Sequence, residues 1–224
     1  MLTRTHNFLA IVGVGGLMLI GSATAAAAAA AATPQSRHGG DRNANLRELT
    51  AAWWKWSIAN PLADHPFSDP PAHDCTFAQS GKTWFLGGVF NSSGTAVRKC
   101  TVPEGTNLLI PALNVECSNV EADPFHADTA AKQEACARSF RMTDIRVTLD
   151  GRAVPVTYVV SPQFTFAAPA DNVLSVTGPI AGTSVSAGWW ALLRPSEGNH
   201  IVKFGGRFPD FDFAIDITYI LRVD

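Results

Sequence analysis

Charge is scarce in this chain of 224 residues. Charged residues make up 16% of it, and 17 Lys and Arg against 19 Asp and Glu leave a net charge of −2 at pH 7. With no basic excess and no basic cluster, the chain is not expected to bind nucleic acid. The hydrophobic share of 46% excludes a disordered chain. The sequence therefore predicts a globular protein of one domain, or of two small ones.

Long apolar runs are also missing, except for one near the N-terminus over residues 8–20. Arg4 and His6 precede this run and small residues follow it, as in a secretory signal peptide. The run is shorter than the roughly 20 apolar residues that span a bilayer. We predict a signal peptide over residues 1–32 and a secreted or periplasmic protein with no transmembrane segment after cleavage. A flexible leader is predicted over 33–42 and a single β-rich domain over 43–224.

Cysteines are few: the chain has Cys75, Cys100, Cys117 and Cys136. An even number is compatible with two disulfides, which are expected in an exported protein. Of the three possible pairings we favour Cys75–Cys100 and Cys117–Cys136, because each closes a local loop. The spacing contains neither C-x2-C nor paired histidines, so zinc binding through these cysteines is not expected.

Two segments have the pattern of helices. Apolar residues recur at spacings of 3, 4 and 3 between Leu46 and Trp56, which predicts a helix over residues 43–60. A second helix is predicted over residues 128–141, with Asp128 as its N-cap. It lies between the last two cysteines, so the predicted disulfide would tie it to the end of a strand.

Most of the remaining chain has the pattern of short strands. Asp150-Gly151 supplies the positive φ angles of a tight hairpin turn. Strands are predicted over 83–90, 98–102, 107–113, 144–149, 153–160, 163–167, 172–177, 186–193, 200–208 and 211–223. The predicted fold is mainly β: an antiparallel β-sandwich, Ig-like or jelly-roll-like, with an N-terminal Trp-rich helix and a short disulfide-tied helical insertion.

Three motifs occur together: Trp53-Trp54-x-Trp56, Cys75-x3-Gln79-x-Gly81-x-x-Trp84-Phe85-Leu86-x-Gly88, and Arg98-x-Cys100-x-Val102-Pro103-x-Gly105. With this combination the chain resembles a group of uncharacterised secreted bacterial proteins that share these motifs. The resemblance covers most of the mature chain. It implies export, disulfides and a β-rich fold, and it supplies no catalytic residue.

The chain is rich in tryptophan, with six such residues. Neighbouring tryptophans in a helix or a strand point in different directions, so they are not expected to share one environment. An exposed indole ring can stack on a sugar ring or an apolar ligand, and the candidates for such stacking are Trp54, Trp84 and Trp190. The alternative is that these rings pack the helix against the sheet as core.

Two acidic, histidine-containing segments are candidates for metal binding. In the first, His65, Asp69 and His73 lie within a Pro-rich stretch and offer nitrogen and oxygen ligands. The alternative is a solvated loop in which the aspartates start turns. The second comprises Glu121, Asp123, His126 and Asp128, and it lacks the spacing of an EF-hand. Both signals are weak, and no metal or other cofactor is predicted.

Candidates for acid catalysis are Glu104, Glu116 and Glu121, since glycoside hydrolysis needs two carboxyl groups about 5–10 Å apart. Glu116 adjoins Cys117 at the end of an apolar strand, so it is expected to be partly buried with a raised pKa. A G-x-S-x-G nucleophile elbow is lacking. His200 is expected to have a structural role. No residue is therefore predicted to be catalytic.

These observations favour a secreted noncatalytic binding module, or one associated with the cell envelope, with carbohydrate as the expected ligand class. Its expected partner is a polysaccharide or a component of the cell envelope. One alternative is an extracellular hydrolase that depends on a metal or on carboxyl groups. Another is a purely structural secreted protein.

Overall fold

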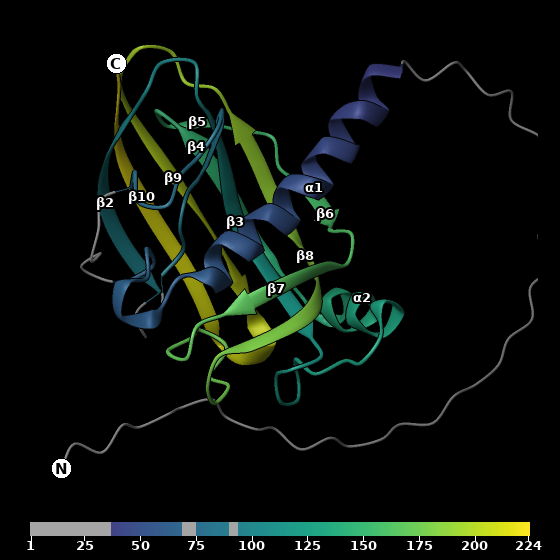
Figure 1. Ribbon diagram of the computed structural model, residues 1–224. Helices are drawn as coiled ribbons and strands as arrows, with labels where there is room; N and C mark the ends of the chain where they lie inside the picture. The colour runs from purple at the N-terminus through teal and green to yellow at the C-terminus, as the bar shows by residue number, and fades with distance from the viewer. Residues whose placement is uncertain (1–36, 69–74, 90–93) are drawn as a thin grey trace, which may run out of the picture.

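The computed structural model describes residues 37–68, 75–89 and 94–224. Two five-stranded sheets form a sandwich, and helix α1 (Arg37–Ala59) crosses one of them (Figure 1). The predicted mainly β fold with an N-terminal helix is therefore confirmed. The predicted signal peptide, residues 1–32, lies outside the described residues. So does the start of the predicted leader, whereas residues 37–42 belong to α1.

The two sheets are built from strands that are interleaved along the sequence. The first sheet has the order β1 (Thr83–Phe85), β3 (Asn107–Ser118), β8 (Ile180–Leu193) and β6 (Thr157–Val160), with β7 (Phe164–Ala168) also paired to β8. The second has the order β2 (Thr95–Val102), β10 (Phe213–Val223), β9 (Gly198–Phe208), β4 (Thr143–Leu149) and β5 (Arg152–Ala153). Most neighbouring strands are antiparallel, as predicted, whereas β1 with β3 and β2 with β10 are parallel.

Three short helical segments complete the fold: η1 (Leu62–Asp64), α2 (Ala130–Ser139) and η2 (Pro209–Phe211). The N-cap of α2 is Thr129, whose side chain accepts a hydrogen bond from the backbone N–H of Lys132, so the predicted cap Asp128 is wrong by one residue. Within the described part of the chain, no helix is long and apolar enough to cross a membrane.

One predicted strand, over residues 172–177, is wrong. The Asn172 side-chain amide donates hydrogen bonds to the carbonyl oxygens of Val176 and Gly178, at 2.8 and 3.2 Å, and its oxygen accepts one from the Val176 N–H. A side chain that satisfies nearby backbone groups in this way competes with strand pairing. These residues therefore form turns before β8.

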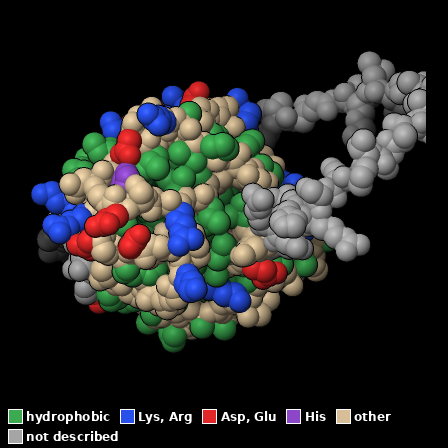
Figure 2. Space-filling model, turned by 90° about the horizontal axis from the view of Figure 1, so that it is seen from above, with side chains coloured by type: hydrophobic (Ala, Val, Ile, Leu, Met, Phe, Trp, Pro, Cys, Tyr) green, Lys and Arg blue, Asp and Glu red, His purple; other side chains and the backbone are tan. Residues whose placement is uncertain are grey.

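The surface of the sandwich carries a mixture of side chains. Seen from above, hydrophobic side chains lie between scattered basic and acidic ones (Figure 2). The large hydrophobic residues that stay exposed include Val97, Ile201 and Ile220, which share the outer face of the second sheet. On the face in Figure 2, charges of the two signs are interspersed.

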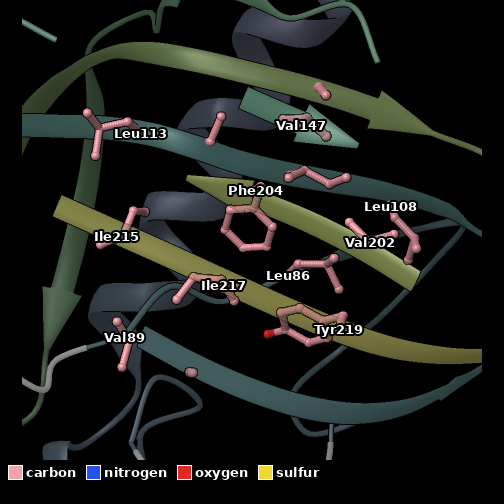
Figure 3. Close-up of a cluster of buried hydrophobic side chains, with 14 of the residues drawn as sticks. Leu86, Val89, Leu108, Leu113, Val147, Val202, Phe204, Ile215, Ile217 and Tyr219 are labelled. Atoms are coloured by element: carbon pink, nitrogen blue, oxygen red, sulfur yellow. The ribbon is translucent and has the colours of Figure 1, made fainter. Parts of the chain in front are cut away.

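The main hydrophobic core lies between the two sheets. Alternate residues of β2 and β10 are buried, which is the pattern of strands with one face on a core. Phe204 and Ile217 from the second sheet meet Leu108 and Leu113 from the first (Figure 3). Gly206 allows this close approach, because a Cβ at this position would lie 3.1 Å from Leu113.

A second core of aromatic rings attaches α1 to the outer face of the first sheet. Trp53 is buried and lies edge-on to Trp190 of β8, with 5.4 Å between the ring centroids. It also stacks on Phe67 at 5.3 Å. Its indole N–H donates a hydrogen bond to the Leu86 carbonyl oxygen at 2.9 Å. The tryptophan-rich helix is thus held by both packing and a buried hydrogen bond.

Both favoured cysteine pairs are disulfides. Cys75–Cys100 links the segment before β1 to β2, and Cys117–Cys136 links the end of β3 to α2. Gln133 supports the same attachment of α2, because its side-chain amide donates hydrogen bonds to the carbonyl oxygens of Ala127 and Thr183. The predicted tie between the helical insertion and a strand is confirmed.

Candidate functional site

The three tryptophans that were candidates for ligand stacking differ in how deeply they are buried. Trp190 is fully buried, with 0% of its surface exposed, so it offers no face to a ligand and its predicted stacking role is wrong. The reason is that α1 covers this side of β8. Trp54 and Trp84 are half-buried. The Trp54 side chain, on α1, packs against residues of β7. Trp84 packs against the core between the two sheets.

His65 is not available as a metal ligand. It is fully buried, its Nε2–H donates to the Ser57 carbonyl oxygen at 2.9 Å, and its Nδ1 accepts from the Phe67 N–H at 3.1 Å. Burial lowers its pKa to about 4, so the ring is neutral. Asp69 and His73 lie outside the described residues. Within the described ranges, no group of three or more metal-binding side chains occurs.

The second acidic segment is organised by hydrogen bonds of its own. Nδ1 of His126 lies 2.9 Å from the Glu121 carbonyl oxygen, and Nε2 lies 3.0 Å from Oδ1 of Asp128. The Glu121 carboxyl group accepts a hydrogen bond from the Ser118 hydroxyl at 2.8 Å. These contacts shape the loop between β3 and α2.

Two of the predicted acidic residues, Glu116 and Glu121, form a carboxyl pair. Glu116 lies on β3 and is only 3% exposed, and its carboxyl group accepts a hydrogen bond from the Ser184 hydroxyl of β8. Burial, followed by its hydrogen bond with Glu121, raises the pKa of Glu116 well above its usual value. Burial also raises the pKa of Glu121. Glu104, the third candidate, is exposed in the turn after β2.

The direct hydrogen bond between these carboxyl groups distinguishes them from the catalytic pair of a glycosidase. Retaining glycosidases hold their two carboxyl groups about 5–5.5 Å apart, with the sugar between them. In this pair one carboxyl group donates directly to the other; Glu116 is buried and Glu121 is half-buried. A raised pKa is typical of acid catalysts and also of buried structural pairs. The geometry here is that of a structural pair.

A depression of about 570 Å³ lies on the outer face of the second sheet. This volume is in the range of roughly 300–1,000 Å³ that small-molecule sites occupy. Its lining residues come from four adjacent strands and combine hydrogen-bond donors and acceptors: Thr95, Arg146, Thr148, Lys203, Asp216 and Thr218. The depression thus offers many polar contacts on a rigid surface.

Strand register explains the shape of this depression. Gly205 on β9 lies between Asp216 on β10 and Arg146 on β4, in one row across the sheet. Because Gly205 has no side chain, the Arg146 guanidinium passes over it and pairs with Asp216 at 3.0 Å. The neighbouring row carries Thr218 and Lys203 side by side. The sequence prediction missed this surface, although the alternation along residues 213–223 indicated an exposed face.

A smaller groove, of about 40 Å³, lies at one edge of the sandwich. Its lining combines aromatic and polar residues from α1, the segment around β1, and strands β2 and β10; Trp56, Phe77, Gln79, Phe85, Arg98 and Tyr219 contribute to it. The Gln79 side chain is fully engaged, since it bonds both the N–H and the carbonyl oxygen of Phe85. Gln79 therefore forms part of the wall of the groove.

Comparison with known proteins shows only distant structural similarities. No family model matches this chain, and no curated protein does. A structure described as PbICP-C in complex with falcipain-2 has a TM-score of 0.27 and 13% identity, over 64% of this chain and all of that one. The solution structure of amebosin has a TM-score of 0.18 and 9% identity, over 58% of this chain and 96% of that one. Similarities this distant say nothing about function.

Proposed function

We propose that this protein is an exported, noncatalytic binding module whose ligand is a carbohydrate, bound on the outer face of the second sheet. The observation that carries the proposal is the depression across β2, β10, β9 and β4. Threonine hydroxyls and charged side chains are suited to sugar hydroxyl groups. Exposed Val97, which also lines the depression, provides apolar surface for the C–H face of a sugar ring.

The carboxyl pair argues for binding rather than hydrolysis. Glu116 and Glu121 are bonded to each other and to serine hydroxyls, and neither lines the depression. Export is supported by the two disulfides, because disulfides form and persist in oxidising compartments outside the cytoplasm. If the ligand is a carbohydrate, the proposed partner of this protein is a polysaccharide or a component of the cell envelope.

The experiment is a pull-down of the oxidised protein on insoluble polysaccharides and cell-wall material, with released sugars measured in the same tubes. We expect retention without released product. Lys203→Ala, in the depression, should reduce retention, whereas Lys132→Ala should not. Lys132 is a matched control because it is an exposed lysine on α2, which packs on the first sheet. Released sugar would contradict the noncatalytic proposal, and absence of retention would contradict carbohydrate binding.

A further inference from the structure

Arg98 is a buried cation that has no acidic partner among the residues that the structure describes. It lies on β2 with 5% of its surface exposed, and its guanidinium donates hydrogen bonds to the carbonyl oxygens of Gly87, Gly88 and Ser68. It also lies over the Tyr219 ring, with 5.8 Å to the centroid. Its partners among the described residues are all uncharged. A buried charge is stabilised most by an opposite charge, which these groups do not supply.

Two residues that line the edge groove carry an N–H group without an acceptor in the described part of the chain. Nε of Arg98 is buried and has no hydrogen-bond partner among the described residues, and the same is true of Nε1 of Trp56. Both residues line the groove. Most buried polar groups in proteins are hydrogen-bonded, so two unpartnered donors in one small groove require an explanation. An acceptor that enters from outside the chain supplies one.

Two of the other polar side chains of the groove, Tyr219 and Gln79, are already hydrogen-bonded, whereas Lys99 adds an exposed ammonium group to the lining. The Tyr219 hydroxyl accepts from the Gly87 N–H at 2.9 Å and donates to the Gly87 carbonyl oxygen at 3.3 Å. The Gln79 amide is bonded to Phe85. What remains for a ligand is therefore two cationic side chains, Arg98 and Lys99, and two N–H donors. The rings of Trp56 and Phe85, whose centroids are 5.6 Å apart, add apolar surface.

We propose that this groove binds the carboxylate group of a small organic acid. The carboxylate accepts hydrogen bonds from Nε of Arg98 and Nε1 of Trp56 and neutralises the buried guanidinium. Charge-assisted bonds of this kind are the strong ones in proteins. The groove volume suits the carboxylate head alone, so the flat apolar body of the ligand lies against the aromatic rim. This site is separate from the depression on the second sheet.

The test uses benzoate as the probe and benzamide as its neutral counterpart. In a spectrum of the six tryptophan indole N–H groups, benzoate should shift the Trp56 signal in a saturable way, and benzamide should bind at least tenfold more weakly. Trp56→Phe keeps an aromatic ring but removes the donor, and should weaken benzoate binding about tenfold, as expected for one hydrogen bond to a charged group. Binding of this variant is followed by the stability that benzoate confers.

Trp54→Phe is the matched control. Nε1 of Trp54 is also buried and has no partner in the described ranges. Because Trp54 does not line the groove, benzoate binding should be unchanged. Arg98→Lys should abolish benzoate binding if the variant folds. If it does not fold, Trp56→Phe remains the deciding variant.

Three results would overturn the proposal: equal binding of benzamide, no saturable shift of the Trp56 signal, or equal weakening of benzoate binding by Trp54→Phe. Inorganic phosphate that binds as well as benzoate would overturn the organic-acid class. Lys203→Ala should leave benzoate binding intact, so this proposal and the carbohydrate proposal fail separately.

Discussion

Glu116 and Glu121 share a hydrogen bond between their carboxyl groups, and burial raises the pKa of both. The folded protein therefore binds a proton on Glu116 more tightly than the unfolded chain does. The resulting stabilisation is present below pH 4.5, the usual pKa of the group, and is lost as pH rises through the raised pKa of the folded state. At neutral and alkaline pH the pair should therefore lower the free energy of unfolding.

Glu116→Gln should make the protein less sensitive to rising pH. A glutamine amide can donate to Glu121 and accept from Ser184, as the protonated acid does, but it cannot ionise. We expect the variant to be more stable than the wild type at pH 8, and its advantage to shrink or reverse at pH 5. Urea unfolding at the two pH values measures this.

Exposed Glu104 provides the control for this experiment, since Glu104→Gln should have the same small effect at both pH values. Comparing each variant with the wild type at the same pH cancels contributions from other titrating groups. A Glu116→Gln variant that is destabilised equally at pH 5 and pH 8 would contradict the shared proton.

The pKa values of His65 and His200 should be shifted in opposite directions from the usual value. Burial lowers the pKa of His65 to about 4, whereas the hydrogen bond to Asp150 raises the pKa of His200 above 6.5. Stability linked to His65 should therefore be lost as pH falls from 6.5 towards 4, and stability linked to His200 should be lost as pH rises through its raised pKa. Following both imidazole rings by NMR tests this in one sample. A pKa of His65 near 6.5 would show that burial does not hold the ring in its neutral form.

Trp53→Phe should cost more stability than Trp190→Phe. Both rings are buried, but the Trp53 indole N–H bonds the Leu86 carbonyl oxygen, whereas that of Trp190 has no partner among the described residues. The two variants remove similar volumes, so the difference of about 1 kcal/mol reports the hydrogen bond. Denaturant unfolding measures it. Equal losses would mean that packing alone attaches α1 to the sheet.

Gly205→Ala should be much more destabilising than Gly151→Ala. A Cβ at Gly205 would lie 2.1 Å from the backbone oxygen of Ile215, so β9 and β10 would have to separate. We expect a loss of about 3 kcal/mol, as for an overpacked site. At Gly151 the space is open and only the positive φ of 77° opposes a side chain, at a cost of about 1 kcal/mol. Thermal unfolding of the two variants ranks them, and a mild Gly205→Ala would contradict the close packing of these strands.

Local patterns were sufficient for much of the fold. The periodicity between Leu46 and Trp56, the Asp150-Gly151 turn and the alternation along 213–223 all depend on neighbours within a few residues. The disulfide pairing followed from loop length in the same way. Asn172 shows where this reasoning fails, because its side-chain bonds to Val176 and Gly178 replaced a strand by turns.

The sequence by itself determined the class of the fold, the helix that carries the tryptophans and the two disulfides, because each is encoded by residues close together in the chain. It also marked Glu116 as a buried acid. Only the tertiary structure decided which tryptophans are fully buried, since α1 covers Trp190 from a distant part of the chain. The depression and the Arg98 groove depend equally on strand register and on contacts between distant segments, and such contacts leave no local signal.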